Sequence, residues 1–123
     1  MVDEDLTRRI IGGAIKVHQH WGPGLYEEIY ERSLARELGL EGLSVERQVV
    51  LPLVYRGETI GDSLRVDLFV EKRVVVEVKA VSGLEPIHES QVLTYLRLTG
   101  CRVGLLINFD ERKLMDGVKR LVL

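Results

Sequence analysis

Apolar residues recur at helical spacing near the start of the chain, at Leu6, Ile10, Ala14 and Val17. This spacing predicts a helix that Asp3 can cap and that Gly22 ends. A second helix is predicted over residues 25–38, with Gly39 as its C-cap. The chain is therefore expected to begin with two amphipathic helices joined by a turn that contains glycine and proline.

Strand-like segments follow the second helix. Residues 45–55 (VERQVVLPLVY) indicate one long strand in which Val45 and Val49 share a face. Pro52 cannot donate a ladder hydrogen bond, so we expect the strand to bend there or to lie at a sheet edge. Residues 64–81 (LRVDLFVEKRVVVEVKAV) predict two further strands joined by a tight turn.

The last third of the chain predicts a helix between two strands. Residues 86–99 begin with proline, which suits the first turn of a helix, and Gly100 follows as a cap. Residues 101–109 (CRVGLLINF) are typical of a buried strand, parallel to the strand before the helix. A short helix over 111–117 and a strand over 118–123 complete an α/β sandwich with a mixed central sheet.

Size and composition narrow the class of protein. The chain has 123 residues, of which 46% are hydrophobic, so we expect residues 1–123 to form a single domain. The single Cys101 cannot form an intramolecular disulfide, and neither a signal peptide nor a membrane span is evident, which predicts a cytoplasmic protein. The net charge of −2 does not indicate binding to phosphate backbones, so a nucleic-acid function has to rest on motifs.

Three charges interrupt the apolar strands of residues 64–81. A strand buried on both faces should be nearly continuous in apolar residues, yet this segment carries Asp67, Glu77 and Lys79. Glu77 and Lys79 point to the same face because side chains alternate along a strand. A three-residue loop at 71–73 would set Asp67 opposite Glu77, whereas a two-residue loop would put them on opposite faces. We predict the three-residue loop.

Two adjacent carboxylates favour a divalent cation. Asp67 and Glu77 would repel each other unless a cation lay between them, and Mg²⁺ prefers oxygen ligands with retained waters. An ammonium group such as that of Lys79 can stabilise developing negative charge or help position a metal-activated water.

Three elements of the sequence, taken in order, resemble one known family. Asp67 followed by Glu77-Val78-Lys79 resembles the D…(D/E)-x-K signature of the PD-(D/E)XK nuclease superfamily. Residues 24–30 (GLYEEIY) match the GxxExxY pattern that names a small family within it, and residues 91–95 (QVLTY) resemble the QxxxY element of its RecB-like branch. The resemblance extends from about Leu6 to Val122, although Val66 replaces the proline of the signature.

The resemblance implies a restriction-endonuclease-like αβββαβ core and a Mg²⁺- or Mn²⁺-dependent nuclease acting on DNA. It implies that Asp67 and Glu77 bind the metal, with Glu27 contributing directly or through water. Lys79 would assist the water or the charged transition state. Gln91 and Tyr95 would orient the lysine, a metal-bound water or a phosphate.

The candidate residues on the second helix have simpler interpretations too. A helical period places Glu27 on the same arc as Tyr30, which is expected to face the core. Glu27 alone could simply complement the helix dipole, and the resemblance favours the site role instead. Tyr30 can either hydrogen-bond the Glu27 carboxylate or fill the core. Glu28 and Glu31 are expected to be solvated.

Histidines and the third helix offer further polar groups. His88, Gln91 and Tyr95 fall on one face of the helix over residues 86–99. For His88 we favour a polar rim over a site role, and only the resemblance assigns Gln91 and Tyr95 to the site. His18 and His20 are expected to be structural or exposed, because no spacing pairs them with another type of metal ligand.

Two other interpretations compete with a nuclease. The chain could be a catalytically inactive nucleic-acid-binding or protein-assembly module that retains the fold. Alternatively, Asp67, Glu77 and Lys79 could form a buried ion network that binds no ligand. A homodimer is expected for an enzyme that cuts both strands of a duplex, since two sites are then needed.

Overall fold

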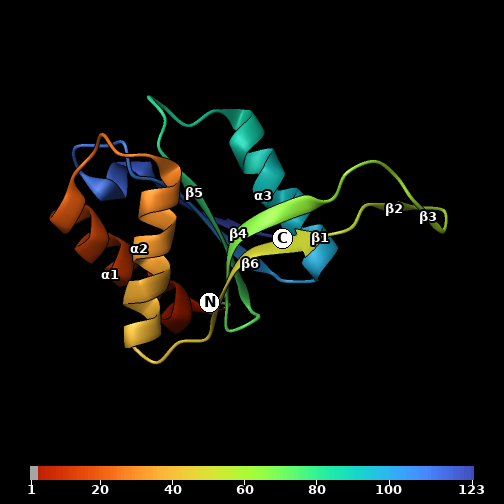
Figure 1. Ribbon diagram of the computed structural model, residues 1–123, viewed down its shortest axis with the longest axis horizontal. Coiled ribbons are helices and arrows are strands. Elements are labelled where there is room, and N and C mark those ends of the chain that lie inside the picture. Colours follow the sequence, from red (N-terminus) through yellow and green to blue (C-terminus); the bar gives the residue numbers. More distant parts are fainter. Residues whose placement is uncertain (1–2) are drawn as a thin grey trace.

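The computed structural model describes residues 3–123 and contains a five-stranded mixed sheet with helices on both faces (Figure 1). The strand order in this sheet is β1-β4-β5-β6-β7. The elements are α1 (Glu4–Trp21), α2 (Glu27–Leu40), β1 (Val45–Leu51), β2 (Val54–Tyr55), β3 (Glu58–Thr59), β4 (Leu64–Val70), β5 (Val74–Lys79), α3 (Pro86–Thr99), β6 (Val103–Asn108), the 3₁₀ helix η1 (Leu114–Gly117) and β7 (Val118–Val122). The predicted α/β fold class is confirmed.

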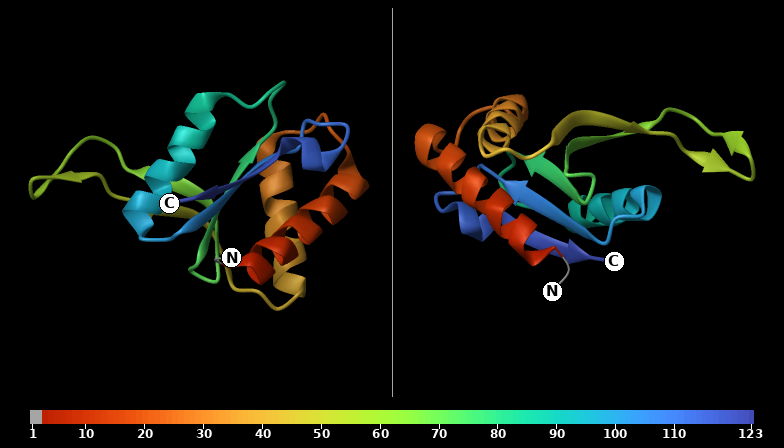
Figure 2. Two further views of the ribbon diagram at one scale, coloured as in Figure 1. Left: turned by 180° about the vertical axis from the view of Figure 1, so that it is seen from behind. Right: turned by 90° about the horizontal axis from the view of Figure 1, so that it is seen from below.

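Alternating residues of the central strand β5 divide the core into two layers. Val74, Val76 and Val78 pack with the apolar stripes of α1 and α2 on one face. Val75 packs with Val92 of α3 and its neighbours on the other face. Figure 2 shows this arrangement edge-on, with the α1–α2 pair and α3 on opposite sides of the sheet. By the same alternation, Glu77 and Lys79 belong to the face covered by α3.

The crossover from β5 through α3 to β6 is the parallel unit that the apolar run predicted. β5 and β6 pair in parallel, with Glu77 beside Leu106 and Lys79 beside Asn108. All residues of β6 are buried, as expected for a strand covered on both faces. The carboxyl ends of both strands therefore lie together, and loops leave the sheet at that edge.

Helix α2 ends at Leu40, and the glycine of its C-terminal cap is Gly42 instead of the predicted Gly39. Gly39 lies inside the helix, and Gly42 adopts φ 85°. The Gly42 N–H donates to the Gly39 carbonyl at 3.0 Å, and the Leu43 N–H donates to the Leu38 carbonyl at 3.1 Å, which is the pattern of a Schellman motif. Leu38 and Leu43 are both buried in the same core, and this contact favours the later stop.

Asp3 does not cap α1 as predicted. Its backbone is left-handed, with φ 50°, and its side chain makes no capping hydrogen bond. The carboxylate instead accepts a hydrogen bond at 2.9 Å from Nε of Arg73 in the β4–β5 loop. The start of α1 is thus tied to the sheet by an ion pair that is distant in sequence.

The predicted strand over residues 45–55 is divided at Pro52. β1 ends at Leu51 and is an edge strand, as the proline suggested. The prediction that Val45 and Val49 share a face is wrong, because Val45 packs on the α1–α2 side and Val49 on the α3 side. Gln48 lies between them with φ 52°, and this left-handed residue interrupts the alternation of side chains.

The β4–β5 hairpin has the predicted three-residue loop. Val70 pairs with Val74, and the same register continues to Leu68 and Val76. The loop contains no glycine, and Glu71 and Lys72 both adopt a φ of 53°. The Glu71 N–H donates to the Ser44 carbonyl at 2.8 Å, which holds the loop against the start of β1.

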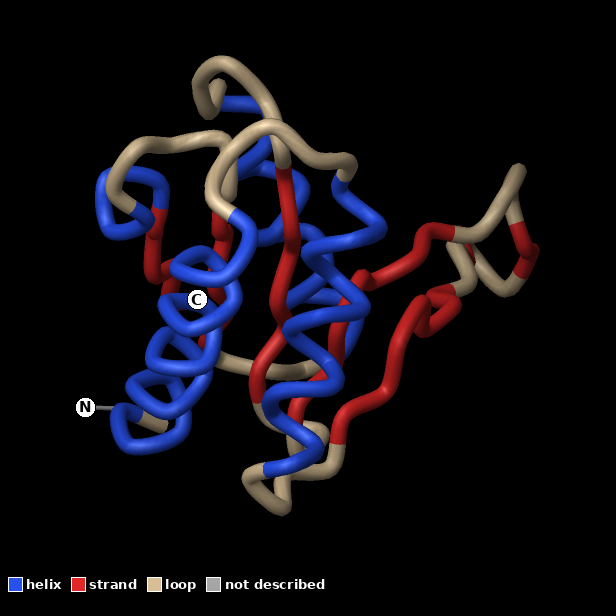
Figure 3. Tube along the Cα trace, turned by 60° about the vertical axis from the view of Figure 1, so that its left-hand side comes forward, coloured by secondary structure: helices blue, strands red, loops and turns tan. Residues whose placement is uncertain are grey.

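An arm formed by residues 52–63 extends from the open ends of β1 and β4 (Figure 3). β2 and β3 pair across Arg56 and Gly57, which both have positive φ and suit a two-residue hairpin turn. The arm exposes the apolar side chains of Val54, Tyr55 and Ile60. Within residues 3–123, no helix is both long and apolar enough to cross a lipid bilayer.

Candidate active site

The two acidic residues of the central hairpin lie where β4 and β5 separate. Backbone pairing ends at Leu68 and Val76, one position before Asp67 and Glu77. The Asp67 N–H donates to Oε1 of Glu77 at 3.3 Å, and the Val78 N–H donates to Oδ2 of Asp67 at 2.9 Å. Side-chain carboxylates thus accept N–H groups that backbone carbonyls would otherwise accept, and both acids are held at this opening of the sheet.

Lys79 completes the group on the α3 face. Its Nζ lies 3.7 Å from Oε2 of Glu77, and its side chain is only 17% exposed. The predicted convergence of Asp67, Glu77 and Lys79 is therefore present in the fold. The separation between Nζ and Oε2 is longer than a hydrogen bond, so the ammonium group keeps its donors for another acceptor.

Burial and charge act together on the Glu77 carboxyl. Glu77 is only 4% exposed, and this desolvation, followed by the nearby charge of Asp67, raises its pKa to about 8. The Lys79 ammonium and the hydrogen bond from the Asp67 N–H act in the opposite direction but do not cancel these effects. Near neutral pH the Glu77 carboxyl therefore keeps a proton, whose place a cation could take.

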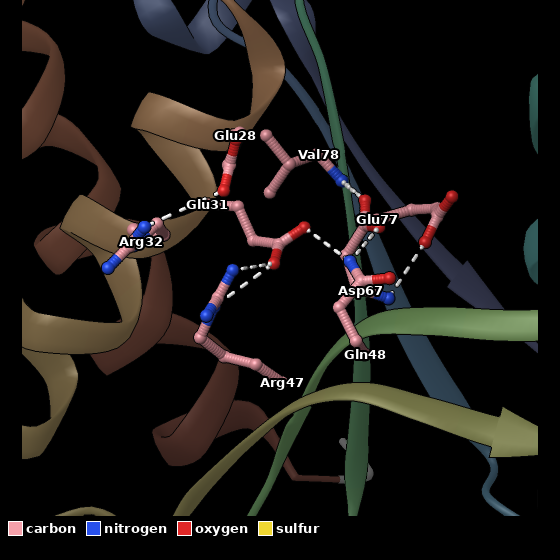
Figure 4. A network of polar contacts seen from close by, with 8 residues as sticks. All are labelled: Glu28, Glu31, Arg32, Arg47, Gln48, Asp67, Glu77 and Val78. Carbon is pink, nitrogen blue, oxygen red and sulfur yellow. Dashed lines mark hydrogen bonds and ion pairs between the residues drawn. The ribbon is translucent and has the colours of Figure 1, made fainter.

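A second polar network reaches Asp67 from α2 through β1 (Figure 4). Nε2 of Gln48 donates to Oε1 of Glu31 at 2.8 Å and to Oδ1 of Asp67 at 3.3 Å. Arg47 forms an ion pair with Oε2 of Glu31, with Nη2 at 2.9 Å. In Figure 4, Asp67 lies between Glu31 and Glu77.

The structure reverses the expected exposure of two glutamates on α2. Glu31, expected to be solvated, is buried, whereas Glu27, expected on the core-facing arc, is exposed. Burial, followed by the charge of Asp67, raises the pKa of Glu31, and the hydrogen bonds from Arg47 and Gln48 oppose that rise. A buried carboxylate needs such partners, and the polar residues of β1 that supply them were the signal in the sequence.

Glu27 nevertheless lines the same cleft as Asp67. This cleft has a volume of about 340 Å³, and its wall is formed by Glu27, Glu28, Glu31, Arg47, Gln48 and Asp67. The cleft lies between α2 and the edge of the sheet, so groups from both elements face one space. A ligand at Asp67 could therefore be approached from α2 as well as from α3.

Tyr95 of α3 lies close to the acidic pair. It is buried in the α3-side core, and burial, followed by the charges of Glu77 and Asp67, raises its pKa to about 12. Its phenol is therefore a neutral hydrogen-bond donor at physiological pH. Gln91 is half-buried one helical turn earlier. The crossover helix thus places Tyr95 near the carboxylates of the β4–β5 hairpin.

The three histidines of the chain differ in their burial and contacts. Nδ1 of His88 accepts the Glu85 N–H at 3.0 Å and helps to cap α3, a contact that the expected polar rim did not specify. His18 is buried, and its Nε2 lies 2.7 Å from the Glu111 carbonyl. His20 is exposed. These positions confirm the expectation for both N-terminal histidines.

Tyr30 fills the core and does not contact Glu27 through a hydrogen bond. Its ring stacks on that of Phe109 with 4.6 Å between centroids. Its hydroxyl donates to the Gly22 carbonyl and accepts the Leu25 N–H at 3.1 Å. Of the two open interpretations, core packing is confirmed, and the hydroxyl organises the turn between α1 and α2.

Asn108 is a buried polar residue that the sequence did not reveal as important. Its side chain accepts the Val81 N–H at 3.0 Å and donates to the Val81 carbonyl at 2.9 Å. Its position beside Lys79 in the β5–β6 register places these contacts directly after β5. Its location within an apolar run, CRVGLLINF, was the available signal, because a buried amide requires partners.

Comparison with family models shows that residues 4–121 match the PD-(D/E)XK nuclease superfamily. The match covers nearly the whole chain and includes Asp67, Glu77, Lys79 and the helices on both faces of the sheet. The chain belongs to the PD-(D/E)XK nuclease superfamily. Comparisons with curated proteins and with solved structures found no match. Membership in this superfamily indicates a nuclease-type function and a restriction-endonuclease-like fold.

Divalent metals are typical of PD-(D/E)XK nucleases, and the donor set here fits such an ion. Among residues 3–123, no group of three or more His, Cys, Asp or Glu side chains is arranged as a complete metal cage. Mg²⁺ does not need one, because it commonly uses one or two carboxylates together with waters and substrate phosphates. The neighbouring carboxyl groups of Asp67 and Glu77 meet that requirement once Glu77 has released its proton.

Proposed function

We propose that the chain is a Mg²⁺- or Mn²⁺-dependent nuclease that hydrolyses phosphodiester bonds of DNA. The observation that carries this proposal is the meeting of Asp67 and Glu77 where β4 and β5 separate, with Lys79 beside them. Two carboxylates and an amine at one opening of a sheet provide both a cation site and a donor for a charged phosphate.

Each residue has a distinct role in this proposal. Asp67 and Glu77 hold the divalent cation, which activates water and offsets phosphate charge when bound. Lys79 donates to the phosphate oxygen that gains negative charge, because its ammonium group has donors to spare. A deprotonated Glu77 is required, so the pKa of about 8 in the metal-free protein couples cation binding to proton release.

Residues of the flanking helices position the reacting groups. We assign Gln91 and Tyr95 to the orientation of Lys79, a water or a phosphate, supported by the nearness of Tyr95 to the acidic pair. We assign Glu27 to a contact through water, since it is exposed yet lines the cleft that reaches Asp67. These groups approach the same carboxylates from opposite faces of the sheet.

We infer a narrower place for the chain within its superfamily. Residues 24–30 support the GxxExxY family, and residues 91–95 support the RecB-like branch. The roles of Tyr30 and Tyr95 in the fold fit this inference, because one tyrosine organises the α1–α2 turn and the other lies near the acids. We also infer a cytoplasmic location, supported by the single, unpaired Cys101.

We propose that the partners are DNA and a second copy of the chain, with the arm as the contact between copies. A two-stranded hairpin has little stability of its own, and this arm exposes Val54, Tyr55 and Ile60. Its charged residues are Arg56, Glu58 and Asp62, so its net charge does not favour phosphate. An apolar arm with this charge suits a protein surface better than a nucleic acid.

The dimer can be tested separately from catalysis by sedimentation. Wild-type protein is expected to sediment as a dimer, and the double variant Tyr55→Ser/Ile60→Ser as a monomer. The matched control is Ile87→Ser, which removes an exposed apolar side chain on α3. A monomeric wild type, or a double variant that remains dimeric, would contradict the arm contact.

Cleavage assays and Mn²⁺ titration distinguish the enzyme from its rivals. The proposal predicts cleavage of at least one form of DNA with Mg²⁺ or Mn²⁺, and loss of Mn²⁺ binding in Asp67→Asn. A binding or assembly module would bind a partner without cleaving DNA. Wild-type protein that is inert on every DNA and RNA form with both metals would contradict the proposed activity.

A further inference from the structure

Gln48 has an unusual backbone in the middle of an edge strand. Its φ is 52°, although Arg47 and Val49 on either side keep the regular antiparallel register with β4. A left-handed conformation is sterically unfavourable for a non-glycine residue. Such residues persist where surrounding contacts require them, and they concentrate at functional sites. The flanking pairs of Arg47 with Leu68 and of Val49 with Val66 place Gln48 opposite Asp67, one of the two acids at the opening of the sheet.

The side chain of Gln48 joins two carboxylates that would otherwise repel each other. Nε2 lies 2.8 Å from Oε1 of Glu31 and 3.3 Å from Oδ1 of Asp67. Only a group with two N–H donors can serve both oxygens at once, and the amide nitrogen of glutamine has two. Arg47 holds the other oxygen of Glu31, with Nη2 at 2.9 Å, so Gln48 is anchored to a fixed partner.

Asp67 is thereby held at both oxygens. Oδ2 accepts the Val78 N–H at 2.9 Å, and Oδ1 accepts from Gln48. These two contacts set the plane of the carboxylate and leave its remaining lone pairs for another ligand. Without Gln48, Oδ1 of Asp67 would lose its contact from β1, and the carboxylate could rotate more freely.

The residue type at position 48 serves the side-chain contacts better than it serves the backbone. Glycine adopts positive φ without steric cost and would suit this point of β1. Glutamine is strained there but provides the amide that connects Glu31 to Asp67. The strained backbone of Gln48 is explained if this position requires the side-chain amide more than it requires an unstrained backbone.

We propose that Gln48 is a positioning residue that orients the Asp67 carboxylate for cation binding, using Glu31 and Arg47 as its anchor. The cation-binding part of this inference rests on the proposed function, whereas the orientation of Asp67 is a property of the metal-free protein. Gln48 acts through Asp67 and need not touch the substrate.

The test compares Gln48→Gly with Glu46→Gly. The first variant removes the amide and relieves the left-handed strain. The second introduces the same flexibility at an exposed position of β1, outside the network. In metal-free protein, amide hydrogen exchange at Val78 reports whether Asp67 still accepts its N–H. Exchange at Val75, which is buried in the same strand, reports global opening.

In Gln48→Gly, exchange at Val78 is expected to quicken about fivefold or more relative to Val75, as for the loss of one hydrogen bond. Mn²⁺ affinity, measured by calorimetry, is expected to fall about 10- to 100-fold, as for other residues that orient a metal ligand. In Glu46→Gly, both the Val78-to-Val75 ratio and the affinity should equal those of the wild type.

Two results would overturn the inference. One is an unchanged Val78-to-Val75 ratio in folded Gln48→Gly, which would mean that Gln48 does not hold Asp67. The other is a Mn²⁺ affinity of Gln48→Gly that lies within about twofold of the wild-type value. Loss of a residue that orients a metal ligand changes the affinity by a much larger factor. A wild type without Mn²⁺ binding would instead contradict the proposed function and the cation-binding role of Gln48, while the exchange ratio still decides whether Gln48 orients Asp67.

Discussion

The Asp67 N–H donates to Oε1 of Glu77 at 3.3 Å, so the acid of one strand is held by the backbone of its neighbour. The reciprocal contact, from the Val78 N–H to Asp67, anchors the second acid in the same way. Movement of either strand would therefore displace both carboxylates. This mutual attachment explains how two acids remain close at an opening where the backbone ladder has ended.

Replacement of Lys79 distinguishes a catalytic role of its amine from a role in a structural ion pair. Lys79→Ala is expected to abolish cleavage while the protein remains folded, because the amine is proposed to stabilise charge that develops on the phosphate. Circular dichroism and single-turnover cleavage measure the two properties. The matched control is Lys72→Ala, which removes an exposed lysine in the adjacent hairpin loop and should leave cleavage unchanged.

A second variant, Lys79→Met, also distinguishes the structural ion network from the catalytic role. A purely structural ion network predicts that methionine at this position is neutral or stabilising, since replacing buried ions by apolar groups often is. That network also predicts no loss of any activity. Retention of wild-type cleavage by either Lys79 variant would contradict the catalytic role.

The raised pKa of Glu77 predicts a specific dependence of stability on pH. The folded protein keeps a proton on Glu77 up to a pKa of about 8, whereas the unfolded chain releases it near the ordinary glutamate pKa of 4.5. Between these values the folded state binds more protons, so the free energy of unfolding falls as pH rises. The Tm of metal-free wild type should decrease across this window, and Glu77→Gln should make the decrease shallower.

The raised pKa of Glu31 also makes the free energy of unfolding fall as pH rises. The Tm of Glu77→Gln should therefore still decrease with pH, although less steeply than that of the wild type. The control Glu46→Gln alters an exposed carboxyl and should keep the wild-type slope. A wild-type slope in Glu77→Gln would show that Glu77 is not the group responsible.

Cation binding should reverse this protonation of Glu77. Mn²⁺ has to displace the proton, so its affinity for wild type should rise about tenfold per pH unit until pH reaches about 8 and then level off. Calorimetry in buffers of different ionisation enthalpy counts the released protons. A Mn²⁺ affinity that stays constant between about pH 6 and pH 8 would contradict the raised pKa of Glu77.

Glu27 and Tyr30, two of the three positions that the GxxExxY pattern names, should have separable effects. Tyr30→Phe removes the hydroxyl that contacts Gly22 and Leu25, so it should lower stability by about 1–2 kcal/mol while cleavage per folded molecule stays unchanged. Glu27→Gln changes an exposed side chain in the cleft and should alter cleavage without altering stability. Urea unfolding and initial rates provide the two readouts, and the opposite pattern would refute this division.

The central hairpin could be predicted because its pattern combines two strong constraints. Residues 64–81 have the pattern of two strands. Only a connecting loop with an odd number of residues puts Asp67 opposite Glu77. The parallel strand β6 followed from its apolar composition, and α3 from Pro86 and Gly100. These elements depend on local composition and short-range register, which the sequence contains directly.

The polar network around Asp67 could not be predicted from spacing alone. The helical period placed Glu27 toward the core, yet α2 packs so that Glu31 is buried beside Arg47 of β1. That orientation depends on how the helix sits on an edge strand whose side chains change face at Gln48. Tertiary packing and one left-handed residue therefore decided which carboxylate joins the site.

A crystal soaked in Mn²⁺ tests the central claim most directly. Anomalous density is predicted between Asp67 and Glu77, within about 2.0–2.3 Å of an oxygen from each carboxylate. The same soak of Asp67→Asn should show no such peak. Wild-type crystals with both carboxylates open to solvent and no anomalous peak between them, at Mn²⁺ concentrations that saturate other sites, would contradict the account.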